Sequence, residues 1–167
     1  MSLATLIILG RDLKPDLISG LLGIEPDQAW AKGERKSYKR KDGSIRTFNS
    51  RHGRGGWKAL LKGAKRRWSL PTQIRFWCDR LMPKRSALCK LQRLGYSVLI
   101  DCCATAPDSV HFDAELHRQL AALNVGLDIT FYRSQESANQ QGGSNGRQPL
   151  RSVRVRKSAA AAARRSP

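Results

Sequence analysis

The stretch from Leu3 to Gly23, LATLIILGRDLKPDLISGLLG, decides the fold of this 167-residue chain. Residues 3–9 are apolar or nearly so on both alternating faces, which is typical of a strand buried in the middle of a sheet. Pro15 then suits the first turn of a helix, and Gly23 stands where a left-handed helix cap belongs. The stretch therefore predicts a central strand that leads directly into a helix.

The elements that follow alternate between strands and helices. Asp42-Gly43 is a favoured two-residue hairpin turn between SYKRK (37–41) and SIRTF (44–48). Helices are also predicted over 70–95, broken at Pro83, and over 113–124, with Asp113 as N-cap; strands are predicted over 57–61, 96–103 and 126–133. This order predicts an α+β fold, with an antiparallel or mixed sheet and helices packed mainly on one face. A ferredoxin-like variant is the arrangement we expect.

Positive charge is concentrated in two segments. The chain carries 31 Lys and Arg against 13 acidic residues, a net charge of +18. Residues 31–68 hold fourteen of these cations and two acids, residues 133–167 hold eight and one, and the rest of the chain is close to neutral. Such clusters either aid solubility or favour a polyanionic partner, which could be nucleic acid, an anionic membrane or an acidic protein.

The first basic segment supplies candidate phosphate contacts. Lysine and arginine neutralise phosphates without reading sequence, and nothing in the segment indicates base recognition. Trp57 and Trp77 fit a core, whereas Trp68 is the better candidate for stacking on a base, because it follows three cationic residues. The nucleic-acid-binding residues that we predict are Lys39, Arg40, Lys41, Arg46, Arg51, Arg54, Lys62, Lys65, Arg66, Arg67 and Trp68.

We expect a single domain over residues 1–132, with a basic insert at about 33–68 and a disordered basic tail at 133–167. The tail has no apolar periodicity that could offset the entropy of ordering it. The apolar start is too short for a membrane span, and no positive charge precedes it as in a signal peptide. The four cysteines form no CxxC pair, which excludes a zinc ribbon and fits free thiols in the cytoplasm.

The sequence gives little support for metal or enzymatic chemistry. HFDAELH brings His111, Asp113, Glu115 and His117 close together, but the first two are expected before a helix and the last two on different sides of it. A nucleophile at one of the adjacent cysteines 102–103, with His111 as its base, is disfavoured because buried strand thiols are usually inert. No Walker-type loop, nucleophile elbow or HExxH motif occurs. We therefore expect no enzyme, no cofactor and no metal.

Several spaced blocks carry a resemblance to a known family. They are LIILGRDLKPDLISGLLGIEPDQAWAKGE, GGWKAL, LMPKRSALCKLQRLGYSVLIDC and FDAELHRQLAALNVGLDITFY. Together, over about residues 3–132, they resemble the bacterial family DUF4279, a domain of unknown function. The resemblance implies a small bacterial α+β domain, and it supplies no catalytic residues. The basic insert and the tail look like additions to the family pattern.

These observations favour a non-enzymatic binding module whose basic insert and tail hold nucleic acid or another polyanion electrostatically. The alternative is a protein-interaction domain, such as an immunity or inhibitor protein, whose positive segment complements an acidic partner. The two hypotheses differ in their salt dependence. Nucleic-acid binding should weaken steeply with salt, whereas a dedicated protein partner should be retained through an apolar anchor.

Overall fold

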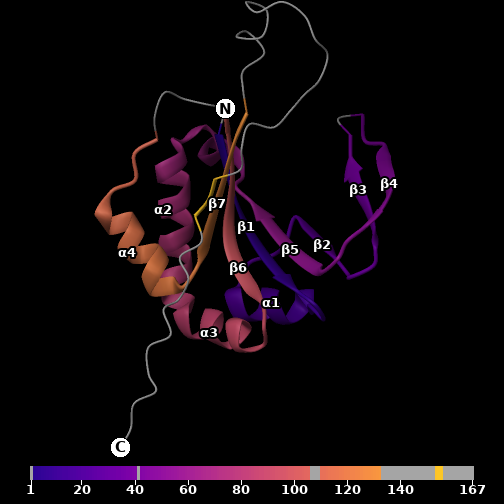
Figure 1. Ribbon diagram of the computed structural model, residues 1–167, viewed down its shortest axis with the longest axis horizontal. Coiled ribbons are helices and arrows are strands. Elements are labelled where there is room, and N and C mark those ends of the chain that lie inside the picture. The colour runs from indigo at the N-terminus through magenta and orange to yellow at the C-terminus, as the bar shows by residue number, and fades with distance from the viewer. Residues whose placement is uncertain (1, 41, 106–109, 133–152, 156–167) are drawn as a thin grey trace, which may run out of the picture.

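The computed structural model describes residues 2–40, 42–105, 110–132 and 153–155. A six-stranded sheet in the order β2-β5-β1-β6-β7-β8 lies beside helices, and a separate two-stranded sheet, β3-β4, forms an arm (Figure 1). The strands are β1 Ser2–Gly10, β2 Gln28–Trp30, β3 Arg35–Lys39, β4 Ile45–Arg51, β5 Gly55–Leu60, β6 Ser97–Thr105, β7 Gly126–Tyr132 and β8 Val153–Val155. The helices are α1 Pro15–Leu22, α2 Leu70–Leu81, α3 Arg85–Arg93 and α4 Ala114–Leu123, with short 3₁₀ turns η1 Gly63–Arg67 and η2 Met82–Lys84.

The first strand lies inside the sheet, as its two apolar faces predict. β1 pairs antiparallel with β5 on one side and with β6 on the other. β6 and β7 are parallel, and α4 makes the crossover between them. The sheet is therefore mixed, which confirms the predicted α+β class. The element order is longer than the β-α-β-β-α-β order of a ferredoxin-like fold, because β2, the arm, both helices α2 and α3 between β5 and β6, and β8 are added.

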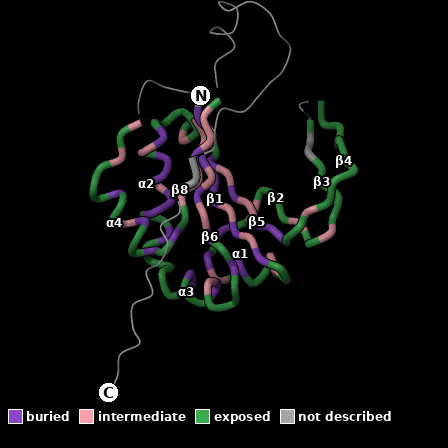
Figure 2. Tube along the Cα trace, in the orientation of Figure 1, coloured by how far each residue is buried: buried purple, intermediate pink, exposed green. Residues whose placement is uncertain are grey.

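The helices cover one face of the sheet. On β1 the side chains of Ala4, Leu6 and Ile8 are fully buried under them. Two tryptophans join the layers: the indole of Trp57 donates to the Ser19 hydroxyl of α1 at 3.3 Å, and that of Trp77 donates to the Ala4 carbonyl at 3.1 Å. Both rings are buried, in agreement with their predicted place in the core. Figure 2 shows the buried residues gathered in the sheet and helices, while the arm is mostly exposed.

The helix ends follow the sequence signals. α1 begins at Pro15 and ends at Gly23, whose φ of 62° is the left-handed conformation that glycine tolerates. The helical stretch over 70–95 breaks at η2, which contains Pro83. α4 begins after Asp113, whose carboxylate accepts from the Leu116 N–H at 2.8 Å. It ends at Asn124, again in the left-handed conformation.

The segment predicted to be a disordered tail contains one described element. β8 pairs antiparallel with β7, with Asp128 opposite Arg154 in the register. The rest of the predicted tail, residues 133–152 and 156–167, lies outside the described residues. Among the residues that are described, no helix is both long and apolar enough to cross a membrane.

Candidate nucleic-acid interface

The basic segment forms a hairpin arm, residues 35–51, built from β3, its turn and β4. It stands apart from the six-stranded sheet, on the side away from α2 and α4 (Figure 1). The hairpin reverses at Asp42-Gly43, as predicted, but not as a two-residue turn, because Arg40 and Ser44 close it. The Arg40 N–H donates to the Ser44 carbonyl at 2.7 Å, the Gly43 N–H donates to the Arg40 carbonyl at 3.0 Å, and Gly43 has a φ of 87°. The Asp42 carboxylate accepts from the hydroxyl and the N–H of Ser44, and these bonds lower its pKa.

Aromatic and backbone contacts fix the base of the arm. The rings of Trp30 and His52 are stacked with centroids 4.7 Å apart, and the Trp30 indole donates to the Arg54 carbonyl at 3.1 Å. The Arg51 guanidinium donates to the Gly33 carbonyl at 2.7 Å. Because these bonds join β2, the arm and the start of β5, the arm is tied to the sheet at one end only.

The two faces of the arm carry different side chains. Tyr38 lies opposite Arg46 in the register, and Arg46 and Phe48 share one face because strand residues alternate. The Arg46 guanidinium carbon lies 5.4 Å from the centroid of the Phe48 ring, a cation–π contact, and Phe48 is 39% exposed. On the other face Ile45 is 71% exposed. Every residue of β4 is exposed, so the arm presents side chains on both faces.

The predicted binding residues on the arm side are mostly accessible. Arg40, Arg46, Arg51 and Arg54 are all exposed. Lys39 ends β3, but its side chain is outside the described part, and so is Lys41. Among the described arm residues, no lysine or arginine forms an ion pair with an acidic side chain. No described acidic side chain therefore neutralises their positive charge.

The remaining predicted residues form a second group around η1. This turn follows the Leu60 end of β5, whereas the arm joins the Gly55 end, so the structure attaches the two groups to opposite ends of one strand. Arg66 and Arg67 are exposed, whereas the Lys62 ammonium is paired with Asp27 at 3.2 Å. The predicted binding residues therefore lie in two separate groups, one at the arm and one around η1.

Two members of the η1 group have structural contacts. The Lys65 ammonium lies 4.6 Å from the Phe76 ring centroid, and Trp68 packs edge-on against the same ring at 5.9 Å. Trp68 is 38% exposed, so only part of it remains accessible for stacking. The fully buried Gln73 also donates to the Trp68 carbonyl at 2.9 Å, which fixes the backbone there.

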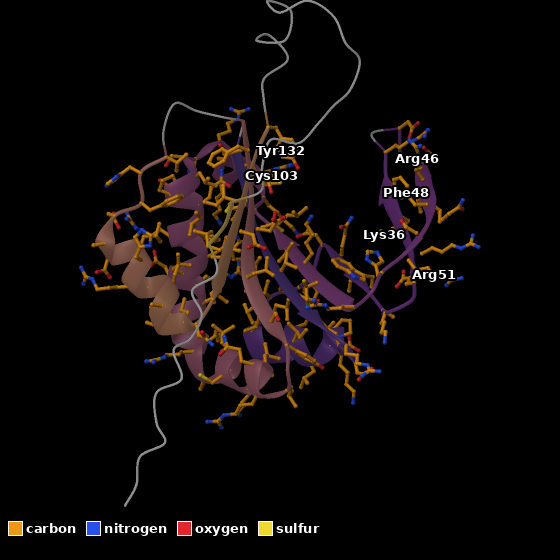
Figure 3. All side chains as sticks on the ribbon, viewed as in Figure 1. Lys36, Arg46, Phe48, Arg51, Cys103 and Tyr132 are labelled. Atoms are coloured by element: carbon orange, nitrogen blue, oxygen red, sulfur yellow. The ribbon has the colours of Figure 1, made fainter. Side chains whose placement is uncertain are left out.

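Phe48 and the neighbouring Lys36 are the arm residues that the sequence reasoning missed. Phe48 stands two positions after Arg46 in a strand whose other residues are polar or charged, apart from Ile45. An aromatic residue in such a strand, with Arg46 and Ser50 rather than apolar residues at the alternate positions, is a signal of a partly exposed ring. Figure 3 labels Lys36, Arg46, Phe48 and Arg51 on the arm, across from Cys103 and Tyr132 on the sheet.

The sheet face that the helices leave uncovered carries a polar cluster. Asp101 lies opposite Thr5 on one side and Asp128 on the other. Burial raises the pKa of Asp101, the charge of Asp128 raises it further, and Lys58 opposes the shift. Beside them, burial also raises the pKa of the Cys103 thiol, which is hydrogen-bonded to Tyr132. This mixed-charge surface differs from the arm, whose described charges are nearly all positive.

The residues considered for metal or nucleophilic chemistry are engaged in other contacts. Asp113 caps α4 and pairs with Arg75, and Glu115 pairs with Arg118 at 2.7 Å. The His117 ring meets Phe112 edge-on. Among the described residues, no three His, Cys, Asp or Glu side chains are grouped to hold a metal ion.

The two buried thiols, Cys78 and Cys102, also lack the environment of a nucleophile. Burial raises the pKa of Cys102 strongly, and the pKa of Cys78 to about 12. Such thiols stay protonated at neutral pH, and the thiolate is the nucleophilic form. His111, the base considered for Cys102 or Cys103, is exposed and precedes α4.

A mixed sheet with helices on one face and a protruding hairpin arm defines a small α+β domain. The chain belongs to the family described as Domain of unknown function (DUF4279), whose model matches residues 1–134. The match spans the arm and every strand of the sheet except β8, and it confirms the resemblance seen in the sequence. No curated protein and no solved structure matches the chain.

Proposed function

We propose that this protein is a non-enzymatic binding module that holds nucleic acid through the phosphates, with the arm as the main contact. The observation that carries the proposal is the position of three arginines on the arm and at its base: Arg40, Arg46 and Arg54 are exposed, and no described acidic side chain pairs with them. Cations without acidic partners on a protruding ribbon can approach a phosphate backbone closely. Arg66 and Arg67 on η1 would provide a second contact.

The charge distribution supports this assignment over a general solubility role. Residues 31–68 hold fourteen cations and two acids, and this excess is concentrated on the arm and η1 rather than spread over the helices. A bacterial cytoplasmic setting agrees with the four free cysteines, because disulfides are rare in that compartment.

A protein-interaction role, as in an immunity or inhibitor protein, is the second candidate, and the exposed Ile45 favours it. An apolar side chain that is 71% exposed could anchor an acidic partner on the arm. Binding of that kind would persist at salt concentrations that abolish phosphate contacts.

The test is fluorescence-anisotropy binding across a salt series, with the full chain freed of nucleic acid. Arg40, Arg46 and Arg54 are replaced together by Gln. The matched control replaces Arg80, Arg85 and Arg93, three exposed arginines on α2 and α3, so that both variants lose the same charge. The arm variant should bind more weakly and reduce the log–log salt slope by about 0.7 to 0.9 for each lost contact.

The control variant should keep most of the affinity of the unmodified chain. Equal losses in both variants would mean that net charge alone attracts the polymer, and the arm would not be its site. Absence of binding at low salt by the unmodified chain would refute nucleic-acid binding and favour a protein partner.

A further inference from the structure

We propose that the face of the arm carrying Arg46 and Phe48 stacks on unpaired bases, so that the polymer is single-stranded nucleic acid rather than duplex. This inference rests on the proposed function and specifies its ligand. It gives Phe48 a role in binding that electrostatic attraction between the arm's cations and phosphates does not require. Lys36, on the neighbouring strand, adds positive charge to the same arm.

The geometry places two flat groups next to each other on one strand. Arg46 and Phe48 are two residues apart on β4, and the guanidinium lies 5.4 Å from the ring centroid. Arginine planes and aromatic rings both stack on bases that are not already stacked. Since each base has a π-face, this contact tolerates any sequence, and it accounts for an aromatic ring among residues that contact phosphate.

The location of the ring distinguishes it from an aromatic residue of the core. The arm is a separate two-stranded sheet, and all of β4 is exposed. Phe48 keeps 39% of its surface accessible on that strand. This accessible part of the ring lies among the arm's cations, where a base held against the phosphate contacts could reach it.

Duplex binding uses an arm of this shape differently. A two-stranded ribbon fits the major groove, where hydrogen-bonding side chains read base edges. In a duplex the base faces are already stacked on one another, so the ring of Phe48 would gain no partner there. A single strand offers those faces, and the arm's cations can follow its backbone.

The experiment measures binding of the full chain to labelled oligo(dT), oligo(U) and a mixed-sequence duplex of equal length, each across the same salt series. Phe48→Leu keeps an apolar side chain but removes the ring, and Phe48→Tyr keeps the ring. Ile45→Ala is the matched control, because it removes a more exposed apolar side chain from the other face. Circular dichroism compares the folding of all variants.

The Leu variant should lose about 5- to 100-fold in affinity for the single strands, as expected for one stacked base, with little change for duplex. The Tyr variant and the Ile45 control should bind as the unmodified chain does. The salt slope should be the same for all four proteins, because no charge changes. Comparing the affinities for oligo(dT) and oligo(U) shows whether the protein prefers single-stranded DNA or single-stranded RNA.

Two results would overturn the inference while leaving phosphate binding intact. One is tighter binding of duplex than of single strands by the unmodified chain. The other is equal affinity of the Leu variant and the unmodified chain for single strands. Failure of the unmodified chain to bind any probe would refute the proposed function and this inference together.

Discussion

The indole ring of Trp30 lies directly over Gly56, so that a Cβ added to Gly56 would collide with Cζ2 of Trp30. Trp30 also stacks on His52 and donates to the Arg54 carbonyl, so this close approach holds the base of the arm. Gly56→Ala should therefore displace Trp30 and destabilise the protein by about 1–3 kcal/mol, with a lower melting temperature.

The matched control for that substitution is Gly53→Ala. A Cβ at Gly53 would meet nothing within 4 Å, although the residue lies three positions away in the same segment. Limited proteolysis should cut the arm faster in the Gly56 variant than in the Gly53 variant. Equal rates would show that Trp30 does not hold the arm.

Gln73→Leu should lower the free energy of unfolding by roughly 1–3 kcal/mol, because it leaves a buried N–H without a partner. The Gln73 side chain is fully buried, and its Oε1 accepts from the Ala4 N–H at 2.8 Å. The pairing of β1 with β5 begins at Thr5, which lies opposite Leu60, so Ala4 has no β5 residue opposite it. The Gln73 side chain accepts the Ala4 N–H in place of that strand partner. Urea denaturation would measure the loss, and an unchanged midpoint would contradict it.

Asp101→Asn should stabilise the protein at neutral pH. Burial raises the pKa of Asp101 above its ordinary value of 3.8, so the folded chain holds this proton more tightly than the unfolded chain does. The stability that this proton contributes is complete below pH 3.8 and is lost as pH rises through the folded-state pKa. Unfolding measured across pH should show the two proteins converging in acid and separating above that window.

A second carboxylate provides the control for the Asp101 prediction. Asp128 is the neighbour whose charge raises the pKa of Asp101. Asp128→Asn should shift the pH dependence of the remaining carboxyl towards lower pH. If Asp101→Asn changed stability equally at all pH values, the titration of Asp101 would not be the cause.

Lys65 and Arg66 are adjacent, yet we expect them to affect different properties. The Lys65 ammonium lies over the Phe76 ring, so Lys65→Gln should reduce stability by about 0.5–1 kcal/mol and affect binding little. Arg66 is exposed, so Arg66→Gln should weaken nucleic-acid binding without changing the melting temperature. Thermal unfolding and anisotropy on the same two variants test the pair, and a reversed pattern would contradict it.

Alkylation with iodoacetamide at mildly alkaline pH should modify Cys89 first. Cys89 is exposed on α3, whereas Cys78 and Cys102 are buried and burial raises the pKa of both. Thiols react as thiolates, so the buried pair should react only on unfolding. Peptide mass spectrometry in native and denaturing buffer gives the order, and early labelling of Cys102 would contradict it.

Local signals in the sequence predicted the local structure well. The apolar faces of residues 3–9 identified the central strand, and Asp113 and Gly23 marked helix ends, because these patterns depend on neighbours within a few residues. The turn at Asp42-Gly43 followed for the same reason. The α+β class could be inferred from the order of these elements alone.

Long-range arrangement was harder to predict. The parallel pairing of β6 with β7 and the packing of Trp30 over Gly56 depend on which distant segments meet, and no short pattern encodes that. For the candidate site, Arg40, Arg46 and Arg51 were predicted as accessible cations. The ion pair between Lys62 and Asp27 and the cation–π contact between Lys65 and Phe76 were not predicted. Those partners come from elements that the folded chain alone brings together.

The position of β1 has a consequence for synthesis on the ribosome. β1 is made before its two partners, and its register with β6 joins Ser2–Leu9 to residues 97–104. The most apolar strand of the sheet therefore emerges with neither neighbour available. It can pair with β5 only once residues 55–60 have been made, and with β6 only once residues 97–104 have been made. Such a nascent chain exposes an aggregation-prone apolar segment early. The yield of folded protein in cells should therefore depend on chaperones that shield newly made polypeptides.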